Sequence, residues 1–287
     1  MFLRVEASPP LEVIDLPQGQ VSYRAAGPQA SDRPPVVFLH GLLVDGRLWA
    51  AVADLLAQHG VRSYAPALPL GAHPAPMRPD ADLTPRGVAR LALDLIAALD
   101  LRDVTLVGND TGGAIAQFVL DTDPAPIGRV VLTNCDAFDA FPPPPLVPLI
   151  RALRHPALVA AMAPGLRSAR LRHGRFGFGP LASQPFDPEL TGSWVRPLAD
   201  GRIRRDLAKV ARGIDPNDLL DVSTRLKQTA GPVRVLWGDD DGYFPVDLGR
   251  RLAGAFADAT FETVAGGRTF LPLDHPDRVA AAILATT

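Results

Sequence analysis

One aspartate of this sequence lies in a context that suits a nucleophile or a general acid. The segment Gly108-Asn109-Asp110-Thr111-Gly112 follows four apolar residues, 104–107, and precedes a helix-like run from residue 113. A strand that turns into a helix within five residues strains its middle residue, and small flanking residues relieve the crowding. Aspartate tolerates the left-handed region better than most residues. The pattern predicts that the Asp110 carboxylate stands above the strand end, although a purely structural turn residue is the alternative.

Other polar residues follow the ends of further apolar runs. His40 comes after the run 35–39, Asp136 after 129–133, and Asp241 after 232–237, while His275 lies in the loop before the last helix-like run. Each has a simpler interpretation: His40 as a structural support, Asp136 as a cap, Asp241 as a solvated turn residue and His275 as a surface residue. Parallel strands bring such ends to one edge of a sheet, where ligands bind.

The elements that must position these residues alternate between strand and helix. We expect an antiparallel pair at 11–15 and 20–25, then strands at 35–39, 61–65, 104–107, 129–133, 232–237 and 260–264. Between them lie helical patterns at 48–57, 84–99, 246–256 and 276–284, and one that begins at 113. This alternation predicts an α/β fold with a mainly parallel sheet covered on both faces.

The alternation of strands and helices is interrupted between residues 137 and 229. Helix-like runs such as 146–153 and 203–211 are separated there by loops rich in proline and glycine, and no strand is predicted. We therefore expect a core of residues 1–136 and 230–287, with residues 137–229 inserted as a helical cap, or lid, over the carboxyl ends of the strands.

The composition of the chain excludes several classes of function. The 287 residues carry 29 Lys plus Arg against 31 Asp plus Glu, so no basic excess indicates a nucleic-acid partner. The single cysteine, Cys135, excludes an intrachain disulfide, and no His or Asp cluster has the spacing of a metal site, so neither metal nor cofactor is expected. No signal-like start and no run of about 18 apolar residues is present, which favours a cytoplasmic protein without a membrane partner. The oligomeric state stays open.

Four motifs in order resemble the α/β-hydrolase superfamily over essentially the whole chain. They are His40-Gly41, the elbow 108–112, Leu236-Trp237-Gly238-Asp239-Asp240-Asp241 and Asp274-His275-Pro276. The resemblance implies a mostly parallel eight-stranded sheet with an inserted cap. An aspartate at the elbow is similar to the branch that holds haloalkane dehalogenases, fluoroacetate dehalogenases and epoxide hydrolases.

That branch implies a role for each matching position. Asp110 would attack an sp³ carbon and form an ester, which water then cleaves. The backbone N–H groups of Leu42 and Thr111 would hold the oxyanion. Asp241, with Asp136 as a second possibility, would be the acid that orients a catalytic histidine.

The histidine itself is missing. Thr269 stands at its expected position, and a threonine hydroxyl cannot serve as a base near neutral pH. His275 is a disfavoured substitute. Dehalogenases carry halide ligands where this chain has Thr111 and Leu42, and epoxide hydrolases carry lid tyrosines, whereas no tyrosine lies between 137 and 229.

Three functions stay open. The first is a hydrolase that acts on a small apolar molecule through Asp110, with an unidentified base. The second is a lyase, epimerase or cyclase in which Asp110 is a general acid or base. The third is a binding module that has lost its chemistry. Aromatic residues expected near the cleft, among them Phe138, Trp194 and Phe270, favour an apolar pocket for all three.

Overall fold

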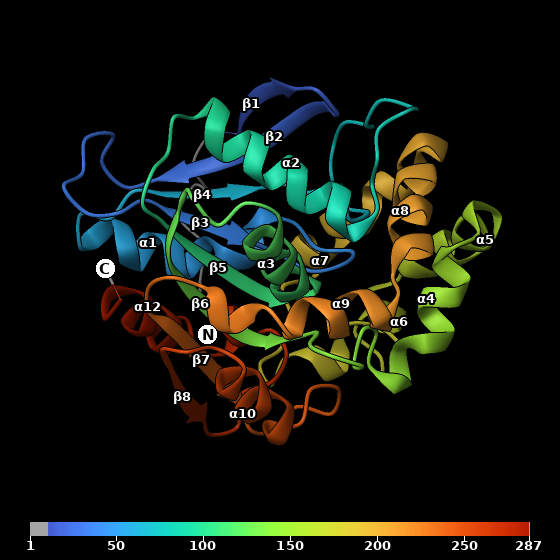
Figure 1. Ribbon diagram of the computed structural model, residues 1–287. Coiled ribbons are helices and arrows are strands. Elements are labelled where there is room, and N and C mark those ends of the chain that lie inside the picture. Colours follow the sequence, from blue (N-terminus) through green and yellow to red (C-terminus); the bar gives the residue numbers. More distant parts are fainter. Residues whose placement is uncertain (1–10, 287) are drawn as a thin grey trace.

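The fold is built on one eight-stranded sheet with helices around it (Figure 1). The computed structural model describes residues 11–286. The strand order is β1-β2-β4-β3-β5-β6-β7-β8. The strands are β1 (Leu11–Leu16), β2 (Gly19–Ala26), β3 (Val36–Leu39), β4 (Ser63–Pro66), β5 (Val104–Asp110), β6 (Ile127–Cys135), β7 (Val233–Gly238) and β8 (Ala259–Val264).

The sheet is antiparallel only at one edge. β2 pairs antiparallel with both β1 and β4, and every other neighbouring pair is parallel. All four residues of β3 and the first six of β5 are buried. Such continuous apolar runs are typical of parallel strands that are covered on both faces. The predicted mostly parallel eight-stranded sheet is therefore confirmed.

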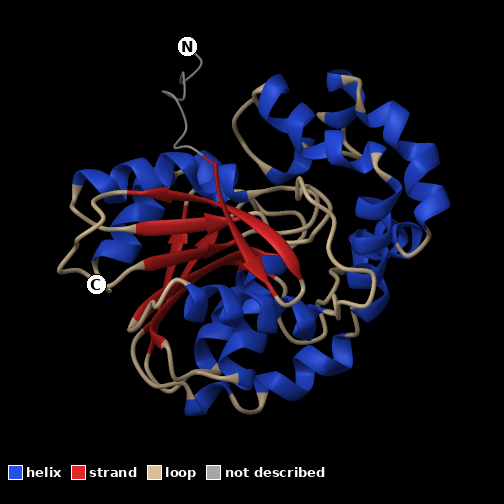
Figure 2. Cartoon of the chain, turned by 90° about the horizontal axis from the view of Figure 1, so that it is seen from above, coloured by secondary structure: helices blue, strands red, loops and turns tan. Residues whose placement is uncertain are grey.

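Helices cover both faces of the sheet, as Figure 2 shows from above. α1 packs on α12, and α2 packs on α3, while α10 contacts β7 and β8. These helices are α1 (Ala50–Gln58), α2 (Pro85–Ala98), α3 (Thr111–Thr122), α10 (Val246–Gly254), α11 (Leu271–Asp274) and α12 (Pro276–Leu284); a short 3₁₀ helix, η1 (Gly46–Trp49), precedes α1. Thr84 caps α2 by accepting from the Gly87 N–H, as the sequence predicts. α3 begins at Thr111, two residues before the predicted start.

The segment between β6 and β7 consists of helices joined by loops and is called the lid segment below. Its α-helices are α4 (Val147–Leu153), α5 (Pro156–Leu166), α6 (Ala169–Arg172), α7 (Pro188–Val195), α8 (Gly201–Gly213) and α9 (Pro216–Ser223). Its 3₁₀ helices are η2 (Pro144–Leu146), η3 (Gly179–Leu181), η4 (Arg196–Ala199) and η5 (Leu226–Gln228). None of the named strands falls in this segment.

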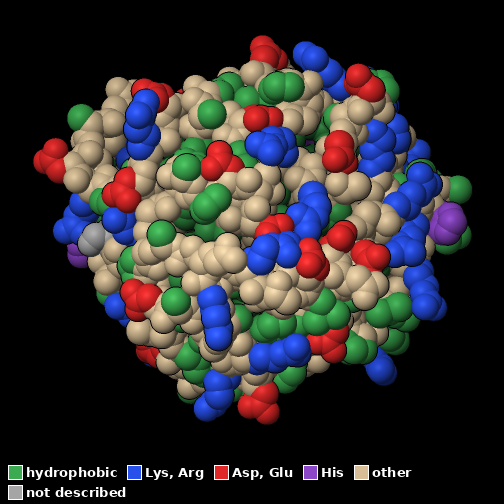
Figure 3. Space-filling model, in the orientation of Figure 1, with side chains coloured by type: hydrophobic (Ala, Val, Ile, Leu, Met, Phe, Trp, Pro, Cys, Tyr) green, Lys and Arg blue, Asp and Glu red, His purple; other side chains and the backbone are tan. Residues whose placement is uncertain are grey.

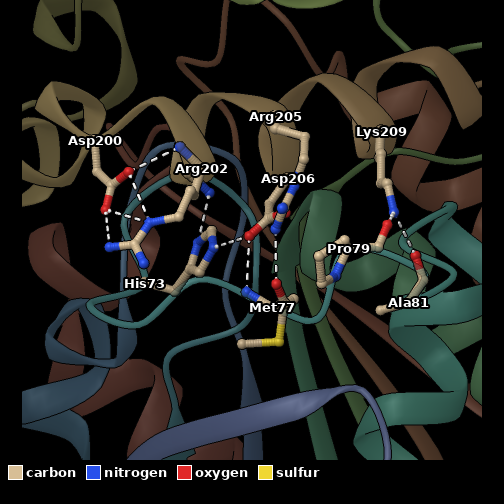
Figure 4. A network of polar contacts seen from close by, with 10 residues as sticks. His73, Met77, Pro79, Ala81, Asp200, Arg202, Arg205, Asp206 and Lys209 are labelled. Atoms are coloured by element: carbon tan, nitrogen blue, oxygen red, sulfur yellow. Dashed lines mark hydrogen bonds and ion pairs between the residues drawn. The ribbon is translucent and has the colours of Figure 1, made fainter.

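One helix of the lid segment is tied to the core by a buried polar network (Figure 4). The fully buried Asp206 on α8 accepts from the Met77 N–H at 2.8 Å and pairs with His73 at 3.4 Å. Arg205 donates to the other oxygen of Asp206 at 2.6 Å, and Lys209 donates to two carbonyls of the loop 66–83. α8 is thereby fixed to the loop that follows β4.

No single helix among the described residues is both long and apolar enough to cross a membrane. The stretches Pro144–Leu153 and Pro156–Leu166 meet that requirement only when taken together, and they are bent by 108°.

Candidate active site

Asp110 lies at the turn between β5 and α3. Its backbone has φ 55° and ψ −133°, a conformation that few residues other than glycine adopt. A Cβ at Gly112 would lie 2.1 Å from the Leu39 carbonyl oxygen, so only glycine lets α3 begin this close to β3. The expected elbow is therefore present, and its packing fixes the direction of the Asp110 side chain.

The Asp110 carboxyl is held by two backbone donors. It accepts hydrogen bonds from the N–H groups of Thr111 and Leu42, the pair that the resemblance assigns to an oxyanion hole. Gly41 packs against the same group, because a Cβ there would lie 1.8 Å from Asp110 Oδ2. The donors thus point at an oxygen of Asp110 itself. This geometry suits charge that develops on the Asp110 carboxyl during cleavage of an ester formed there.

His40 supports the loop that carries one of these donors. Its Nε2 accepts from the Leu68 N–H at 2.9 Å, so its Nδ1 carries the proton and donates to the Gly41 carbonyl at 2.9 Å. Burial lowers the pKa of His40 to about 4, which keeps the ring neutral. His40 therefore positions the Leu42 N–H and does not line the cavity described below.

Asp136 comes next to Asp110 because β5 and β6 are parallel neighbours. Asp110 pairs with Cys135, and the Asp136 N–H donates to the Asp110 carbonyl at 3.4 Å. The Asp136 side chain is 2% exposed and accepts from the Thr111 hydroxyl. Its Oδ1 is buried and has no hydrogen-bond partner. A buried carboxyl oxygen without a partner is costly, so this one calls for a functional explanation.

The two carboxyl groups hold a proton at neutral pH. Burial and then repulsion from Asp241 raise the pKa of Asp110 to about 7, against the two backbone hydrogen bonds. Burial and then repulsion from Asp110 raise the pKa of Asp136 well above its ordinary value. Like charges in one apolar site do not ionise together, so the pair Asp110–Asp136 titrates as a unit.

Asp241 contacts the threonine that stands in the histidine position. Its Oδ2 accepts from Thr269 Oγ1 at 2.9 Å and from Asn134 Nδ2 at 2.8 Å, and its Oδ1 accepts from the N–H groups of Tyr243 and Phe244. Burial raises the pKa of Asp241 despite these bonds. The carboxyl is fully engaged, and Thr269 is fully buried. Asn134, which sequence reasoning missed, also clamps both backbone groups of Gly238.

The structure brings no histidine to Asp110. His275 lies half-buried between α11 and α12, with its Cδ2 near Gly267. His73 is bound to Asp206, and His173 contacts Thr191 Oγ1 at 2.8 Å. None of the six histidines, all within residues 11–286, lines the cavity at Asp110.

That cavity measures about 130 Å³ and lies between the strand ends and the lid segment. Asp110, Thr111 and Asp136 are its polar floor, and Tyr243 joins them from the loop after β7. The remaining wall is almost wholly apolar and consists of Leu42, Leu43, Phe141, Pro142, Pro143, Leu146, Leu149, Ile150, Leu153, Val159, Met162, Leu166, Arg172, Phe176, Gly177, Phe178, Leu181, Val195, Leu198 and Ile214. A cavity of roughly 150 Å³ with such walls accepts a molecule as large as benzene.

Three aromatic residues that we expected at the pocket lie elsewhere. Trp194 is fully buried and donates from Nε1 to Asp45 Oδ1 at 3.1 Å, and Phe270 packs against it. Phe138 lies under the guanidinium of Arg251. The prediction that these three residues line the cavity is therefore wrong. Phe141, Phe176 and Phe178, which are also among the aromatic residues expected near the cleft, do line the cavity.

Arg172 is the one cationic side chain among the cavity-lining residues, and sequence reasoning missed it. It is 3% exposed, and it donates to Thr191 Oγ1 and to the carbonyls of Leu166, Arg167 and Pro188. These bonds use four of its five N–H groups. Burial lowers the pKa of Arg172. Its chief role is therefore to join α6 to α5 and α7.

Among residues 11–286, no group of three His, Cys, Asp or Glu side chains lies close enough to hold a metal ion.

Comparison with known proteins places this geometry in context. The sequence profile of the α/β-hydrolase family matches residues 36–282. A 2-hydroxy-6-oxononadienedioate/2-hydroxy-6-oxononatrienedioate hydrolase of Paraburkholderia xenovorans is 27% identical over 179 residues, which is 60% of this chain and 57% of that relative. The chain thus spans little more than half of that curated relative.

Solved structures are alike over almost the full chain. The haloalkane dehalogenase DbeA of Bradyrhizobium elkani superposes with a TM-score of 0.76 at 18% identity and covers 97% of this chain and 99% of its own. The epoxide hydrolase CorEH superposes with a TM-score of 0.76 at 20% identity, and the match covers 96% of this chain and 98% of that one. At these identities the likeness shows a common fold.

Proposed function

Because the chain belongs to the α/β-hydrolase family, we propose that it hydrolyses a small apolar organic molecule with Asp110 as the nucleophile. One observation carries this proposal: the two oxyanion donors hold the Asp110 carboxyl itself at the floor of an apolar cavity. A serine-type site would keep these donors free for a substrate carbonyl. The lid segment acts as the cap that keeps bulk water from the ester.

We infer that Asp136 supplies the acid and the base that the missing histidine leaves open. While Asp110 is an anion, repulsion keeps Asp136 protonated, and its unpartnered Oδ1 is available to a leaving group in the cavity. Once Asp110 becomes a neutral ester, that repulsion ends and Asp136 ionises more readily. The same carboxyl therefore serves first as acid and then as base, as one carboxyl does in retaining glycosidases.

The steps balance for a substrate with an oxygen leaving group. The Asp110 carboxylate attacks an sp³ carbon and forms a C–O bond, while the C–O bond to the leaving oxygen breaks and that oxygen takes the proton of Asp136. Asp136 then takes a proton from water, and the hydroxide attacks the ester carbonyl carbon of Asp110. The resulting oxyanion is held by Thr111 and Leu42. It collapses as the bond from the carbonyl carbon to the alkyl oxygen breaks, and that oxygen takes the second proton of the attacking water and leaves as the alcohol, which restores the Asp110 carboxylate and protonated Asp136. An epoxide plus water gives a diol by this route.

The activity named for the Paraburkholderia relative fits the cavity poorly. A nonadienedioate carries two carboxylates, whereas the cavity floor carries Asp110 and Asp136, and Asp241 lies close enough to repel Asp110. Arg172 has one N–H left to offer. Like charges would repel a dianion, so an uncharged substrate is favoured.

Oxygen-18 labelling tests the nucleophile. Enzyme in excess is mixed in labelled water with a panel of small apolar epoxides, ethers, alkyl halides and esters, and the peptide that contains Asp110 is weighed by mass spectrometry after one turnover. Label in the Asp110 carboxyl and none in the first product is the expected result. Label in the product with none in Asp110 would mean direct attack by water and would refute the proposal. Asp110→Asn is the matched control.

A non-hydrolytic reaction is the second candidate, favoured by the pKa of about 7 for Asp110, which suits a general acid or base at neutral pH. It predicts deuterium exchange at a carbon acid without incorporation of water oxygen. A binding module that has lost its chemistry would show neither signal, and its ligand affinity would survive Asp110→Ala.

A further inference from the structure

The outer face of the lid segment combines exposed apolar side chains with unpaired arginines. Leu158 and Met162 on α5 are 48% and 39% exposed, Leu171 on α6 is 61% exposed, and Phe176 is 89% exposed. These are four of the six large hydrophobic side chains that are exposed among the described residues. α5 and α6 contact each other, and Met162 and Phe176 line the same cavity, which brings these side chains together. Clustered exposed apolar residues mark an interaction site more often than scattered ones do. We call Leu158, Met162, Leu171 and Phe176 the apolar face.

Only positive charge surrounds this face along the chain. Residues 140–186 contain six arginines and neither aspartate nor glutamate, which leaves the remainder of the chain with 23 Lys plus Arg against 31 Asp plus Glu. Arg151, Arg167, Arg170 and Arg175 are exposed and make no ion pair with any residue of 11–286. Figure 3 shows blue side chains gathered along the right-hand edge, the side on which Figure 1 places α4, α5 and α8.

The apolar face also reaches the cavity. Met162 and Phe176 line the cavity and are exposed to solvent at the same time. The cavity wall therefore meets the molecular surface at these two side chains.

We propose that this face binds the surface of an anionic lipid bilayer, with the apolar side chains in the interfacial region and the arginines at the headgroups. An interfacial helix needs an apolar face flanked by basic residues, and it needs no membrane-spanning length. α5 offers Leu158 and Met162 one turn apart on one side, and the guanidinium of Arg175 stacks over the Phe176 ring at 4.7 Å. The expectation that the chain has no membrane partner rests on the lack of a signal-like start and of a membrane-spanning run, and neither observation addresses such binding.

The chemistry of the face favours a bilayer over a second copy of the chain. Two copies that meet through this face would bring eight unpaired arginines together with no acidic residue from 140–186 to neutralise them. Like charges across an interface are strongly unfavourable. An anionic bilayer supplies the opposite charge and the apolar phase together.

Vesicle co-sedimentation tests the proposal with the whole protein. Vesicles of phosphatidylcholine alone are compared with vesicles of equal parts phosphatidylcholine and phosphatidylglycerol. We expect binding to the second kind only, with loss of binding as sodium chloride is raised, because salt screens headgroup charge. Arg167→Gln/Arg170→Gln should bind about 30-fold more weakly. The control Arg33→Gln/Arg90→Gln removes two exposed arginines elsewhere and should bind as the unchanged protein does.

Leu158→Ser/Leu171→Ser tests the apolar half of the face, since neither residue lines the cavity. It should also weaken binding, whereas sedimentation velocity should find the same monomer for every variant. Equal affinity for both kinds of vesicle, or wild-type binding by Arg167→Gln/Arg170→Gln, would overturn the proposal. A dimer that Leu158→Ser/Leu171→Ser dissociates would assign the face to a second copy and overturn it as well. Vesicle binding needs no turnover, so its outcome is independent of the role of Asp110.

Discussion

Replacing Asp110 with asparagine is expected to stabilise the fold while abolishing turnover. Asparagine has nearly the same shape and carries no charge, so it removes the nucleophile together with the cost of burying an anion. The pKa of Asp110 is raised from 3.8 to about 7. A difference of that size corresponds to about 4 kcal/mol, which is an upper limit for the gain.

The sign of the pH dependence follows from proton binding. Between about pH 4 and about pH 7 the folded wild-type protein binds a proton at Asp110 that the unfolded chain has lost, so its stability falls by about 1.4 kcal/mol per pH unit as pH rises. The variant lacks this titration. The free-energy difference between variant and wild type therefore grows up to about pH 7 and is constant above it. Loss of the Asp110 charge also lowers the pKa of Asp136, which adds to the gain.

Urea unfolding followed by circular dichroism at a series of pH values measures this difference. Asp32→Asn is the control, because Asp32 is exposed and lies far from the elbow in the sequence. A variant that gains the same free energy at every pH would refute the reasoning. A variant less stable than wild type above about pH 7 would do so too.

Three further outcomes are expected. Asp136→Asn should lower kcat by about 10²–10⁴-fold. It should also remove the alkaline limb of the pH–rate profile, while the acid limb stays near the Asp110 pKa of about 7. Retention of both limbs would exclude Asp136 as the acid. Thr269→Val removes one hydrogen bond to Asp241. The free energy of unfolding should therefore fall by about 1 kcal/mol, with kcat/KM nearly unchanged. A large loss of kcat would instead show that Thr269 takes a direct part in the reaction. Asp206→Ala breaks a buried pair and should cost about 3–5 kcal/mol in thermal or urea unfolding. Burial opposes ionisation of Asp206, yet its hydrogen bonds from His73, Arg205 and Met77 lower its pKa, so this stabilisation is present near neutral pH and is lost as pH falls through that lowered value.

Local patterns were sufficient to predict most of the fold. The strand–turn–helix at 104–119 and the Thr84-Pro85 helix start depend on neighbours within a few residues, and the structure shows both. The length and proline content of residues 137–229 likewise predict that this segment interrupts the sheet, but they do not predict how its helices pack. Such features are decided by backbone sterics and capping, which act over short distances in the chain.

The cavity wall could not be predicted in the same way. Whether an aromatic side chain faces the cavity depends on partners far away in the sequence, as the bond from Trp194 to Asp45 shows. The orphan oxygen of Asp136 depends on the register of β5 against β6, which places Thr111 beside one oxygen only. Asn134 gave a weak signal, since it lies two residues before Asp136 at the same strand end, but its hydrogen bonds to Gly238 depend on β7 lying beside β6.

Two parts of the chain contribute different groups to the cavity. The groups proposed to react, Asp110 and Asp136, and their donors Thr111 and Leu42 come from the core, whereas the wall from Phe141 to Ile214 comes from the lid segment. Leu42 contributes to both the reacting site and the wall, because its N–H holds Asp110 while the residue also lines the cavity. Substitutions in the part of the wall that the lid segment supplies are therefore expected to change which molecules enter the cavity without altering the proposed reaction.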